Sequence, residues 1–260
     1  MWQKRPLIPF TLRAANQVKY MACVRHIRRE CLSMINTAEY GLAKYLDFLI
    51  KPHIPSKFML DSTSGFLKNL NDFQFSSTDT LISFDVVSLF TNVPLQDTIH
   101  LITDYIYKSP TKPPFDKATF TRLLEIATGG LFMYQGKFFK QIDGVTMGSP
   151  LGPTLANFCL AHYESSLLND PTSPALYLRY VDDIFCVFRQ GSSHQAFLKK
   201  LNDLHPNLRF TEEIGPSTLP FLDTTISLPD IDGGTVTSRV YRKPTFTGLM
   251  LNFNAMCPFK

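Results

Sequence analysis

Two adjacent aspartates interrupt an apolar stretch near the middle of the chain, in the sequence RYVDDIFCVF (179–188). Leu178 and Tyr180 fall on one side of a predicted strand, and a second apolar run follows the two acids directly. This pattern predicts a β-hairpin with Asp182 and Asp183 at its tip. Adjacent carboxylates repel each other and lose water beside apolar neighbours. Either solvent at an ordinary turn or a bound cation must therefore compensate for their charge.

Composition limits the kinds of protein that this chain can be. It has 260 residues, of which 44% are hydrophobic and 13% aromatic, which is enough to bury a sizeable core. The five cysteines are odd in number and lack paired spacing, which favours free thiols in a reducing compartment. Charges break every apolar run before the roughly 18 residues that a membrane span needs, and the amino terminus lacks a signal-peptide pattern. We therefore expect a soluble intracellular protein without a membrane partner.

Positive charge is concentrated at the amino-terminal end. Residues 1–60 hold ten Lys or Arg against three acidic residues, a balance of +7, so a net charge of +4 leaves −3 for the rest of the chain. Such a basic segment can face a polyanion. A solvated basic tail is an almost equally good interpretation of this asymmetry by itself.

Helical and strand patterns alternate through the first half of the chain without a repeat. Apolar spacing predicts a helix over 36–50 and a strand over 80–85. A helix is expected to begin close to Pro94, and Asp116 is expected to cap the next one. The sequence LFMYQGKFFK (131–140) predicts a hairpin.

The second half repeats this mixture with clearer start and stop signals. Ser149 and Pro150 are predicted to be the cap and first residue of a helix that runs to about Leu168. A further helix is expected at about 193–204, followed by a strand over 208–214. The fold class predicted from these elements is α+β.

Asp85 is the best candidate for a metal-binding partner of the two hairpin acids. It ends an apolar strand where the chain turns towards a helix, a position at which such folds gather catalytic groups. Magnesium prefers a few carboxylates together with water and substrate phosphates. An exposed Asp-Asp turn and a helix-capping Asp85 are nevertheless the favoured reading of these three residues alone.

Five sequence segments in a fixed order change this balance. They are FDVVSLFTNVP (84–94), GVTMGSPLGPTLAN (144–157), RYVDDIF (179–185), LPFLDTTI (219–226) and VYRKPTFTG (240–248). This order resembles the reverse transcriptase of Penelope-like retroelements over most of residues 36–250. The combination of a Tyr-x-Asp-Asp hairpin, a strand-end aspartate about a hundred residues earlier and a Gly-x-x-x-x-Ser-Pro loop between them is a specific signal.

The resemblance implies a right-hand polymerase, with fingers and a palm whose antiparallel sheet is backed by helices. The expected parts of the chain are a basic fingers region at 1–79, of which 1–28 shows little match, palm at 80–112, a fingers-like insertion with a hairpin at 113–148, palm again at 149–218, and a primer-grip-like hairpin with the carboxyl end at 219–260.

The resemblance also assigns the catalytic carboxylates. Asp85 is similar to the first catalytic aspartate of the palm, and Asp182 with Asp183 to the pair on the palm hairpin. Asp85 and Asp182 are expected to bind metal directly, and Asp183 to support the site more loosely. Val86 is expected to offer its backbone carbonyl to a metal ion.

Binding of the incoming nucleotide is expected at two places. Phe90 matches the aromatic steric gate that excludes a ribose 2′-hydroxyl, although simple core packing is the alternative. Gly144, Ser149 and Pro150 resemble the loop that lies against the nascent base pair, where a side chain would block the backbone. Asp143 stands where many reverse transcriptases have glutamine.

Primer and template contacts are expected at the hairpin and towards both ends of the chain. Tyr180 and Val181 would lie along the primer end, and a β-branched residue such as Val181 is strained in a tight turn. Arg242 and Lys243 would contact phosphate, or else be solvated charges on an edge strand. Arg29 resembles a fingers arginine that contacts the triphosphate.

The activity implied by this resemblance is RNA-directed DNA synthesis with two Mg²⁺ ions, for which Mn²⁺ could substitute. Expected partners are an RNA or DNA template, a DNA primer and deoxynucleoside triphosphates, and the expected site of action is the nucleus. Two alternatives are a catalytically silent nucleic-acid-binding remnant of a retroelement and a metal-dependent hydrolase. A helical thumb and a GIY-YIG endonuclease, which the resemblance also implies, are not recognisable in the 260 residues, so short products are expected.

Overall fold

A computed structural model describes residues 12–14, 37–129, 131–134, 137–141, 144–146, 148–168 and 172–243. The seven α-helices of these ranges are α1 (Ala38–Ile50), α2 (Thr63–Asn71), α3 (Leu89–Asn92), α4 (Leu95–Lys108), α5 (Lys117–Thr128), α6 (Leu151–Leu167) and α7 (His194–Asp203), with a short 3₁₀ turn, η1, at Lys51–His53. The ten strands are β1 (Leu12–Ala14), β2 (Thr80–Val86), β3 (Leu131–Tyr134), β4 (Lys137–Gln141), β5 (Leu176–Tyr180), β6 (Asp183–Phe188), β7 (Phe210–Gly215), β8 (Thr218–Phe221), β9 (Thr224–Ser227) and β10 (Thr237–Val240).

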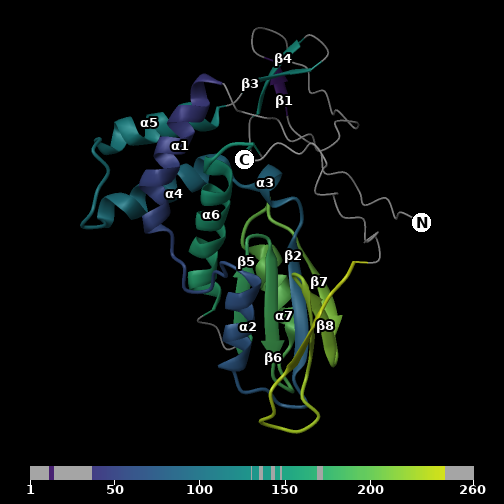
Figure 1. Cartoon of the computed structure of the whole chain (residues 1–260). Helices are drawn as coiled ribbons and strands as arrows, with labels where there is room; N and C mark the ends of the chain where they lie inside the picture. Colours follow the sequence, from purple (N-terminus) through teal and green to yellow (C-terminus); the bar gives the residue numbers. More distant parts are fainter. Residues whose placement is uncertain are drawn as a thin grey trace, which may run out of the picture.

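A four-stranded antiparallel sheet with the order β5-β6-β2-β7 forms the centre of the fold (Figure 1). Helices α2 and α7 lie on its opposite faces. Strand residues alternate between these faces, as the period of two in an extended chain requires. Phe84 of β2 packs towards α7 through contact with Phe197, whereas Phe185 of β6 packs towards α2 through contact with Phe66.

The face of the sheet that carries α7 belongs to the larger of two buried apolar clusters. This cluster joins Ile82, Phe84 and Phe188 of the sheet to helices α1, α4, α5, α6 and α7. Helices α1, α4 and α5 gather at one side of α6 (Figure 1). The helix signals read from the sequence hold here: α4 begins directly after Pro94, and Asp116 caps α5 by accepting a hydrogen bond from the Thr119 amide at 3.0 Å.

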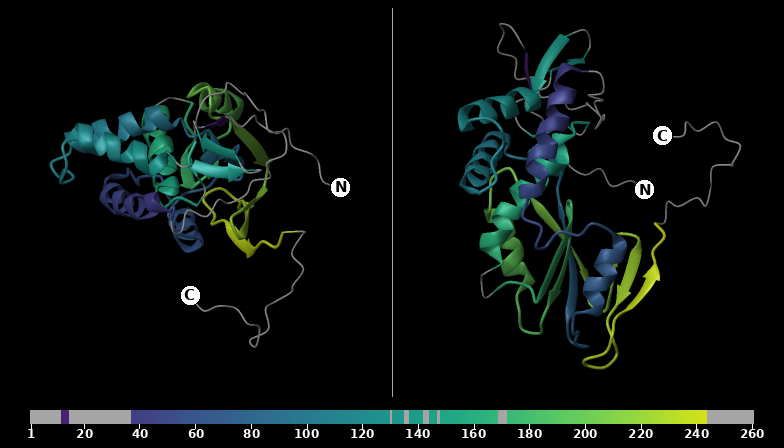
Figure 2. Two further views of the ribbon diagram at one scale, coloured as in Figure 1. Left: turned by 90° about the horizontal axis from the view of Figure 1, so that it is seen from above. Right: turned by 60° about the vertical axis from the view of Figure 1, so that its left-hand side comes forward.

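The opposite face of the sheet is covered by α2 and by a small second sheet, β10-β9-β8. Leu219, Phe221 and Ile226 of β8 and β9 enter the same buried cluster as Phe66 of α2 and Phe185 of β6. Figure 2 shows these strands, in yellow, beside α2. This sheet contains a β8–β9 hairpin that the sequence did not indicate, because its turn includes Leu222 at a φ of 52°, a conformation for which glycine is the usual signal.

The β3–β4 hairpin predicted over 131–140 is present, with β1 as the third strand of its sheet. Its turn residues lie outside the described ranges. Within the described parts of the chain, none of the helices combines the length and apolar character that crossing a membrane requires. The domain boundaries expected at 79, 112, 148 and 218 stay predictions.

Candidate active site

The three candidate carboxylates lie at one end of the central sheet. Asp85 is the register partner of Asp183 across strands β2 and β6, and Asp183 is also paired with Tyr180 across the β5–β6 hairpin. The predicted hairpin is present, but its turn consists of Val181 and Asp182, and Asp183, also expected at the tip, is instead the first residue of β6. We call residues 180–183 the carboxylate turn.

A backbone hydrogen bond fastens the carboxylate turn to β2. The amide of Val86 donates to the carbonyl of Asp182 at 3.2 Å, which places Asp182 beside the strand that carries Asp85. Val181 has a φ of 56°, in the left-handed region that a β-branched side chain rarely adopts. The strain expected from the sequence is present, and the surrounding contacts must hold this conformation in place.

Mutual repulsion is visible in the electrostatics of the site. Loss of hydration beside the strands, followed by the charges of Asp182 and Asp85, raises the pKa of Asp183 to about 6. Lys243 lies close enough to lower that pKa in part. The negative charges of Asp85, Asp182 and Asp183 would therefore be stabilised by a cation placed among them.

The chemistry of these oxygens fits a hard divalent cation. Among the described residues, no group of three or more His, Cys, Asp or Glu side chains is arranged as a ready-made metal cage. Magnesium does not need such a cage, because it usually retains water and takes one or two carboxylates together with substrate phosphates. Asp85 with the two acids of the carboxylate turn could supply this partial set.

The chain turns directly from β2 into the segment that carries Phe90. Ser88, in the left-handed conformation at a φ of 52°, marks this change of direction. Phe90 is half-buried and packs against the larger apolar cluster, so part of its ring surface remains accessible. A side chain at position 152 would lie 3.7 Å from the ring, which shows how closely the start of α6 approaches it.

A glycine-bearing loop, described at residues 144–146 and 148–150, packs against the Phe90 segment. The amide of Val145 donates to the Phe90 carbonyl at 2.6 Å, and that of Gly144 to the Val93 carbonyl at 3.0 Å. Gly144 has a φ of 74°, and an added Cβ would come within 2.6 Å of the Thr91 carbonyl oxygen. Only glycine therefore fits this position, and the loop is brought next to the candidate steric gate.

Ser149 does not cap helix α6, so the cap predicted from the sequence is wrong. Pro150 is already helical and occupies the N-cap position, and the helix makes no side-chain cap bond. The hydroxyl of Ser149 is buried and has no hydrogen-bond partner among the described residues. Pro150, expected beside Ser149 in nucleotide binding, is half-buried.

The residues predicted to contact primer, template or nucleotide elsewhere lie in different surroundings. Tyr180 is half-buried and packs with the α2-side cluster, whereas Arg242 and Lys243 are exposed beyond β10. The amide of Tyr241 donates to the Asp223 carbonyl at 2.8 Å and so extends the β9–β10 pairing towards these two cations. Arg29 and Asp143 lie outside the described residues.

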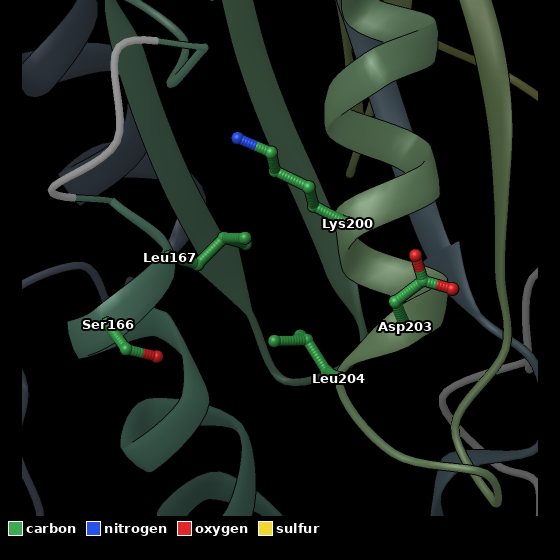
Figure 3. Close-up of a pocket in the computed structure, with 5 residues that line it drawn as sticks. All are labelled: Ser166, Leu167, Lys200, Asp203 and Leu204. Carbon is green, nitrogen blue, oxygen red and sulfur yellow. The ribbon is translucent and has the colours of Figure 1, made fainter.

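Lys200 of α7 belongs to a different part of the surface. It lines a shallow hollow of about 260 Å³ between the ends of α6 and α7, together with Ser166, Leu167, Asp203 and Leu204 (Figure 3). Its ammonium donates to the Thr172 hydroxyl at 3.0 Å. Thr172 precedes β5 and so lies at the end of the strand opposite to the carboxylate turn.

Sequence reasoning missed a buried polar cluster directly behind the carboxylate turn. Arg179 is fully buried and forms an ion pair with Glu164 of α6, whose exposed fraction is 4%. Tyr177 donates to the same carboxylate at 2.8 Å, and burial together with Glu164 raises the Tyr177 pKa, so its hydroxyl stays protonated. The available signal was an arginine at an inward-facing position of a strand, two residues after Tyr177.

Comparison with known proteins identifies the family. The sequence model for "Reverse transcriptase (RNA-dependent DNA polymerase)" matches residues 29–211. Telomerase reverse transcriptase of Rattus norvegicus is 33% identical over 66 residues, which cover 25% of this chain and 6% of the rat protein.

Solved structures agree with the fold. Telomerase from Candida albicans, determined in complex with a fragment of telomeric RNA, has a TM-score of 0.55 at 11% identity and is matched over 76% of this chain and 38% of its own. Apo telomerase from Candida tropicalis, truncated from its C-terminal domain, gives 0.51 at 16% identity over 79% of this chain and 46% of its own. The RNA-dependent RNA polymerase of BmCPV gives 0.50 at 14% identity over 85% and 21%.

The family match extends over the parts of the chain that hold the candidate site. The fold is that of right-hand polymerase fingers and palm, and the chain spans less than half the length of each of these relatives. The matched family segment includes β2, the glycine-bearing loop and the β5–β6 hairpin, and it covers well over half of the chain. This protein therefore belongs to the reverse transcriptase (RNA-dependent DNA polymerase) family.

Proposed function

We propose that this chain carries the catalytic centre of an RNA-directed DNA polymerase, which extends a DNA primer on a nucleic-acid template. The observation that carries this proposal is the register pairing of Asp85 with Asp183, with Asp182 tied to the neighbouring backbone of β2. Family membership supports the same reaction. Template, primer and deoxynucleoside triphosphates would be its partners.

The reaction would form a bond between the primer 3′-oxygen and the α-phosphorus of the nucleotide while the bond to pyrophosphate breaks. Asp85 and Asp182 would hold the divalent ions, with Asp183 beside them and the Val86 carbonyl as a further oxygen ligand. Magnesium ions bound there would make the primer hydroxyl more acidic and offset the charge of the leaving pyrophosphate. The protein itself would contribute position and charge.

Selection of the nucleotide would depend on Phe90 and the loop packed against it. The ring of Phe90 would occupy the space of a ribose 2′-hydroxyl and so favour deoxynucleotides. Gly144, Ser149 and Pro150 would let the loop backbone approach the nascent base pair. Tyr180 and Val181 would lie along the primer end.

Phosphate contacts would come from cations on either side of this centre. Arg242 and Lys243 are exposed beyond β10, and the influence of Lys243 on Asp183 supports a position near the primer phosphates. Arg29 would contact the triphosphate. Because such contacts release counterions from nucleic acid, binding should weaken as salt rises.

A Penelope-like retroelement is the proposed origin of the chain. The support is the order of the five segments from FDVVSLFTNVP to VYRKPTFTG, two of which lie beyond the family match that ends at residue 211. An element that copies itself into chromosomal DNA would act in the nucleus, and we propose that location for this chain.

Extension of a labelled DNA primer on an RNA template tests the proposed activity directly. The wild-type chain with Mg²⁺ and deoxynucleotides should lengthen the primer, and Asp182→Asn should bind the duplex without lengthening it. A gel shift without extension by the wild type would instead indicate a silent nucleic-acid-binding protein. Shortening of the labelled strand would indicate a hydrolase.

A further inference from the structure

Arg179 is a fully buried cation whose hydrogen-bonding capacity is completely used. A guanidinium has five N–H donors. Nε donates to Oε1 of Glu164, and Nη2 donates to Oε2 of the same carboxylate at 3.2 Å. Nη1 donates to Oδ1 of Asn157 at 2.7 Å, and Nη2 donates to the Asn157 carbonyl at 3.4 Å. Nη1 also donates to the carbonyl of Val181 at 3.0 Å. We call Arg179, Glu164 and Asn157 the buried arginine cluster.

The bond to Val181 connects this cluster to the candidate catalytic centre. Val181 is the second residue of the carboxylate turn, its φ is 56°, and its carbonyl immediately precedes Asp182. A left-handed valine is not held by its own preference, so contacts from outside the turn must fix it. The Arg179 guanidinium makes such a contact and ties the turn to α6.

Arg179 is itself rigidly placed. Its amide donates to the Phe58 carbonyl at 2.8 Å, and its carbonyl accepts from the Leu60 amide at 2.7 Å, so the chain before α2 secures this edge strand. The side chain points to the α6 face of the sheet, together with Tyr177. The side chains of Asp85 and Asp183 extend from the other face, because each lies an odd number of residues from the inward-facing Phe84 and Ile184.

The placement of Arg179 favours a positioning role over direct electrostatic stabilisation of the reacting groups. The charge of Arg179 is matched by Glu164 and lies behind the sheet, so the guanidinium does not face the substrate side. A buried ion pair is also weak support for stability, because apolar residues of similar volume often replace one without loss. The Val181 carbonyl is the one acceptor of this guanidinium that belongs to the candidate site.

We propose that Arg179 is a positioning residue, which, through the buried arginine cluster, sets the geometry of the carboxylate turn and thereby the position of Asp182. Its catalytic consequence rests on the proposed polymerase function, whereas its effect on the turn does not. Loss of the cluster should let the turn move away from β2, break the bond between Val86 and Asp182 more often, and weaken binding of the divalent ion.

The variant that tests this is the triple substitution Tyr177→Phe, Glu164→Leu and Arg179→Met. It removes the buried charges together and leaves no unpaired carboxylate in the core, so the fold should persist. Arg179→Lys is the second variant, which keeps the positive charge beside Glu164 but provides three donors in place of the five-donor fork.

Arg189→Met is the matched control. Arg189 follows the other end of β6 and pairs with the buried Asp79 at 2.7 Å, so its removal breaks a partly buried ion pair at the opposite end of the same sheet from the carboxylate turn. Urea unfolding of all variants measures the stability that each one loses.

Amide hydrogen exchange of Val86 is the readout, because a loss of global stability alone would not change it relative to the exchange of other β2 amides. In the triple variant this amide should exchange at least about tenfold faster relative to amides in the middle of β2, since its acceptor belongs to the freed turn. Arg179→Lys should give a smaller increase and Arg189→Met none. Binding of Mn²⁺ to the free protein, followed by electron paramagnetic resonance, should weaken in the same order.

Primer extension completes the test. The maximal rate of nucleotide addition should fall at least about tenfold in the triple variant, with duplex affinity unchanged and partial recovery at high Mn²⁺. Unchanged Val86 exchange in the triple variant and in Arg179→Lys, or an equal change in Arg189→Met, overturns the positioning role. A wild-type chain that does not extend primers overturns the proposed function, and Val86 exchange then still decides the role of Arg179 in the turn.

Discussion

Asp85 and Asp183 are register partners on neighbouring antiparallel strands, and both side chains leave the same face of the sheet. The Asp182 carbonyl accepts the amide of Val86, the residue after Asp85. Two segments almost a hundred residues apart in sequence thus place their carboxylates on one face of the sheet, and a backbone hydrogen bond links them.

Removal of a single carboxylate should abolish nucleotide addition without unfolding the protein. Asp85→Asn or Asp182→Asn should slow single-turnover primer extension by at least about a thousandfold, or about 4 kcal/mol of transition-state stabilisation, because a metal ligand is lost. Duplex binding should persist. Asp203→Asn, at an exposed carboxylate of α7 beside the hollow shown in Figure 3, is the control and should keep the wild-type rate. Near-normal addition by Asp182→Asn would remove this hairpin from the active site.

Substitution of Phe90 should change the choice of sugar. Phe90→Val should raise the incorporation of ribonucleotides relative to deoxynucleotides by about 10–100-fold, equivalent to about 1–3 kcal/mol of lost discrimination. The measurement is the ratio of the two incorporation efficiencies. Phe58→Val is the control for loss of packing, because Phe58 is likewise partly buried against the same cluster. An unchanged ratio would leave Phe90 as a core residue only.

A methyl group at Gly144 should disturb the loop that packs on Phe90. Gly144→Ala places a Cβ 2.6 Å from the Thr91 carbonyl oxygen and also strains a φ of 74°, so the loop must shift. We expect a raised KM for the nucleotide and a loss of stability that exceeds the roughly 1–2 kcal/mol of a left-handed alanine. Gly191→Ala is the control, because Gly191 has a similarly positive φ of 87° but open space around an added Cβ. Equal losses in the two variants, in urea unfolding, would contradict the close approach.

Stability should fall as the pH rises through the titration of Asp183. Its pKa is raised from 3.8 to about 6 in the folded protein, so between these values the folded state retains a proton that the unfolded state has released. The free energy of unfolding in EDTA should therefore decrease from about pH 4 to about pH 6 and then level off.

Asp183→Asn should remove this slope, and Mg²⁺ should reduce it, because the ion competes with the proton. Asp232→Asn is the control, and its effect on the pH dependence of stability should have the opposite sign. Hydrogen bonds from Ser76 and Ser77 lower the pKa of Asp232, so its contribution to stability disappears as the pH falls rather than as it rises. A pH profile of Asp183→Asn that matches wild type would show that another group titrates in this range.

Local signals in the sequence sufficed for much of the fold. Pro94, Asp116 and the acidic hairpin each specify their structure within a few residues, and α4, α5 and the β5–β6 hairpin appear where they were predicted. Such signals act through backbone preference and short-range hydrogen bonds, which a single segment contains. The antiparallel central sheet agrees with the fold that the resemblance implied.

Features that depend on distant contacts could not be predicted in this way. The two residues of α6 that bind the Arg179 guanidinium lie 22 and 15 residues away in sequence, so nothing near Arg179 indicates its burial. Leu222 adopts its left-handed turn because β8 and β9 pack on the sheet, not because leucine favours it. Ser149 has the residue type of a cap, but its hydroxyl is turned into the interior.

Hydrogen bonds fasten the loop between β9 and β10 to the segment that precedes β2. Asp232 accepts hydrogen bonds from the Ser76 hydroxyl at 2.7 Å and the Ser77 amide at 2.8 Å, and the Gly233 amide donates to the Phe75 carbonyl at 3.0 Å. The family match ends at residue 211, yet the strands beyond it close the apolar cluster around Phe66 and Phe185. The cooperative folding unit is thus larger than the segment by which the family is recognised. A protein shortened to that segment would keep α2 on this face but expose the apolar side chains that β8 and β9 cover, and it should aggregate.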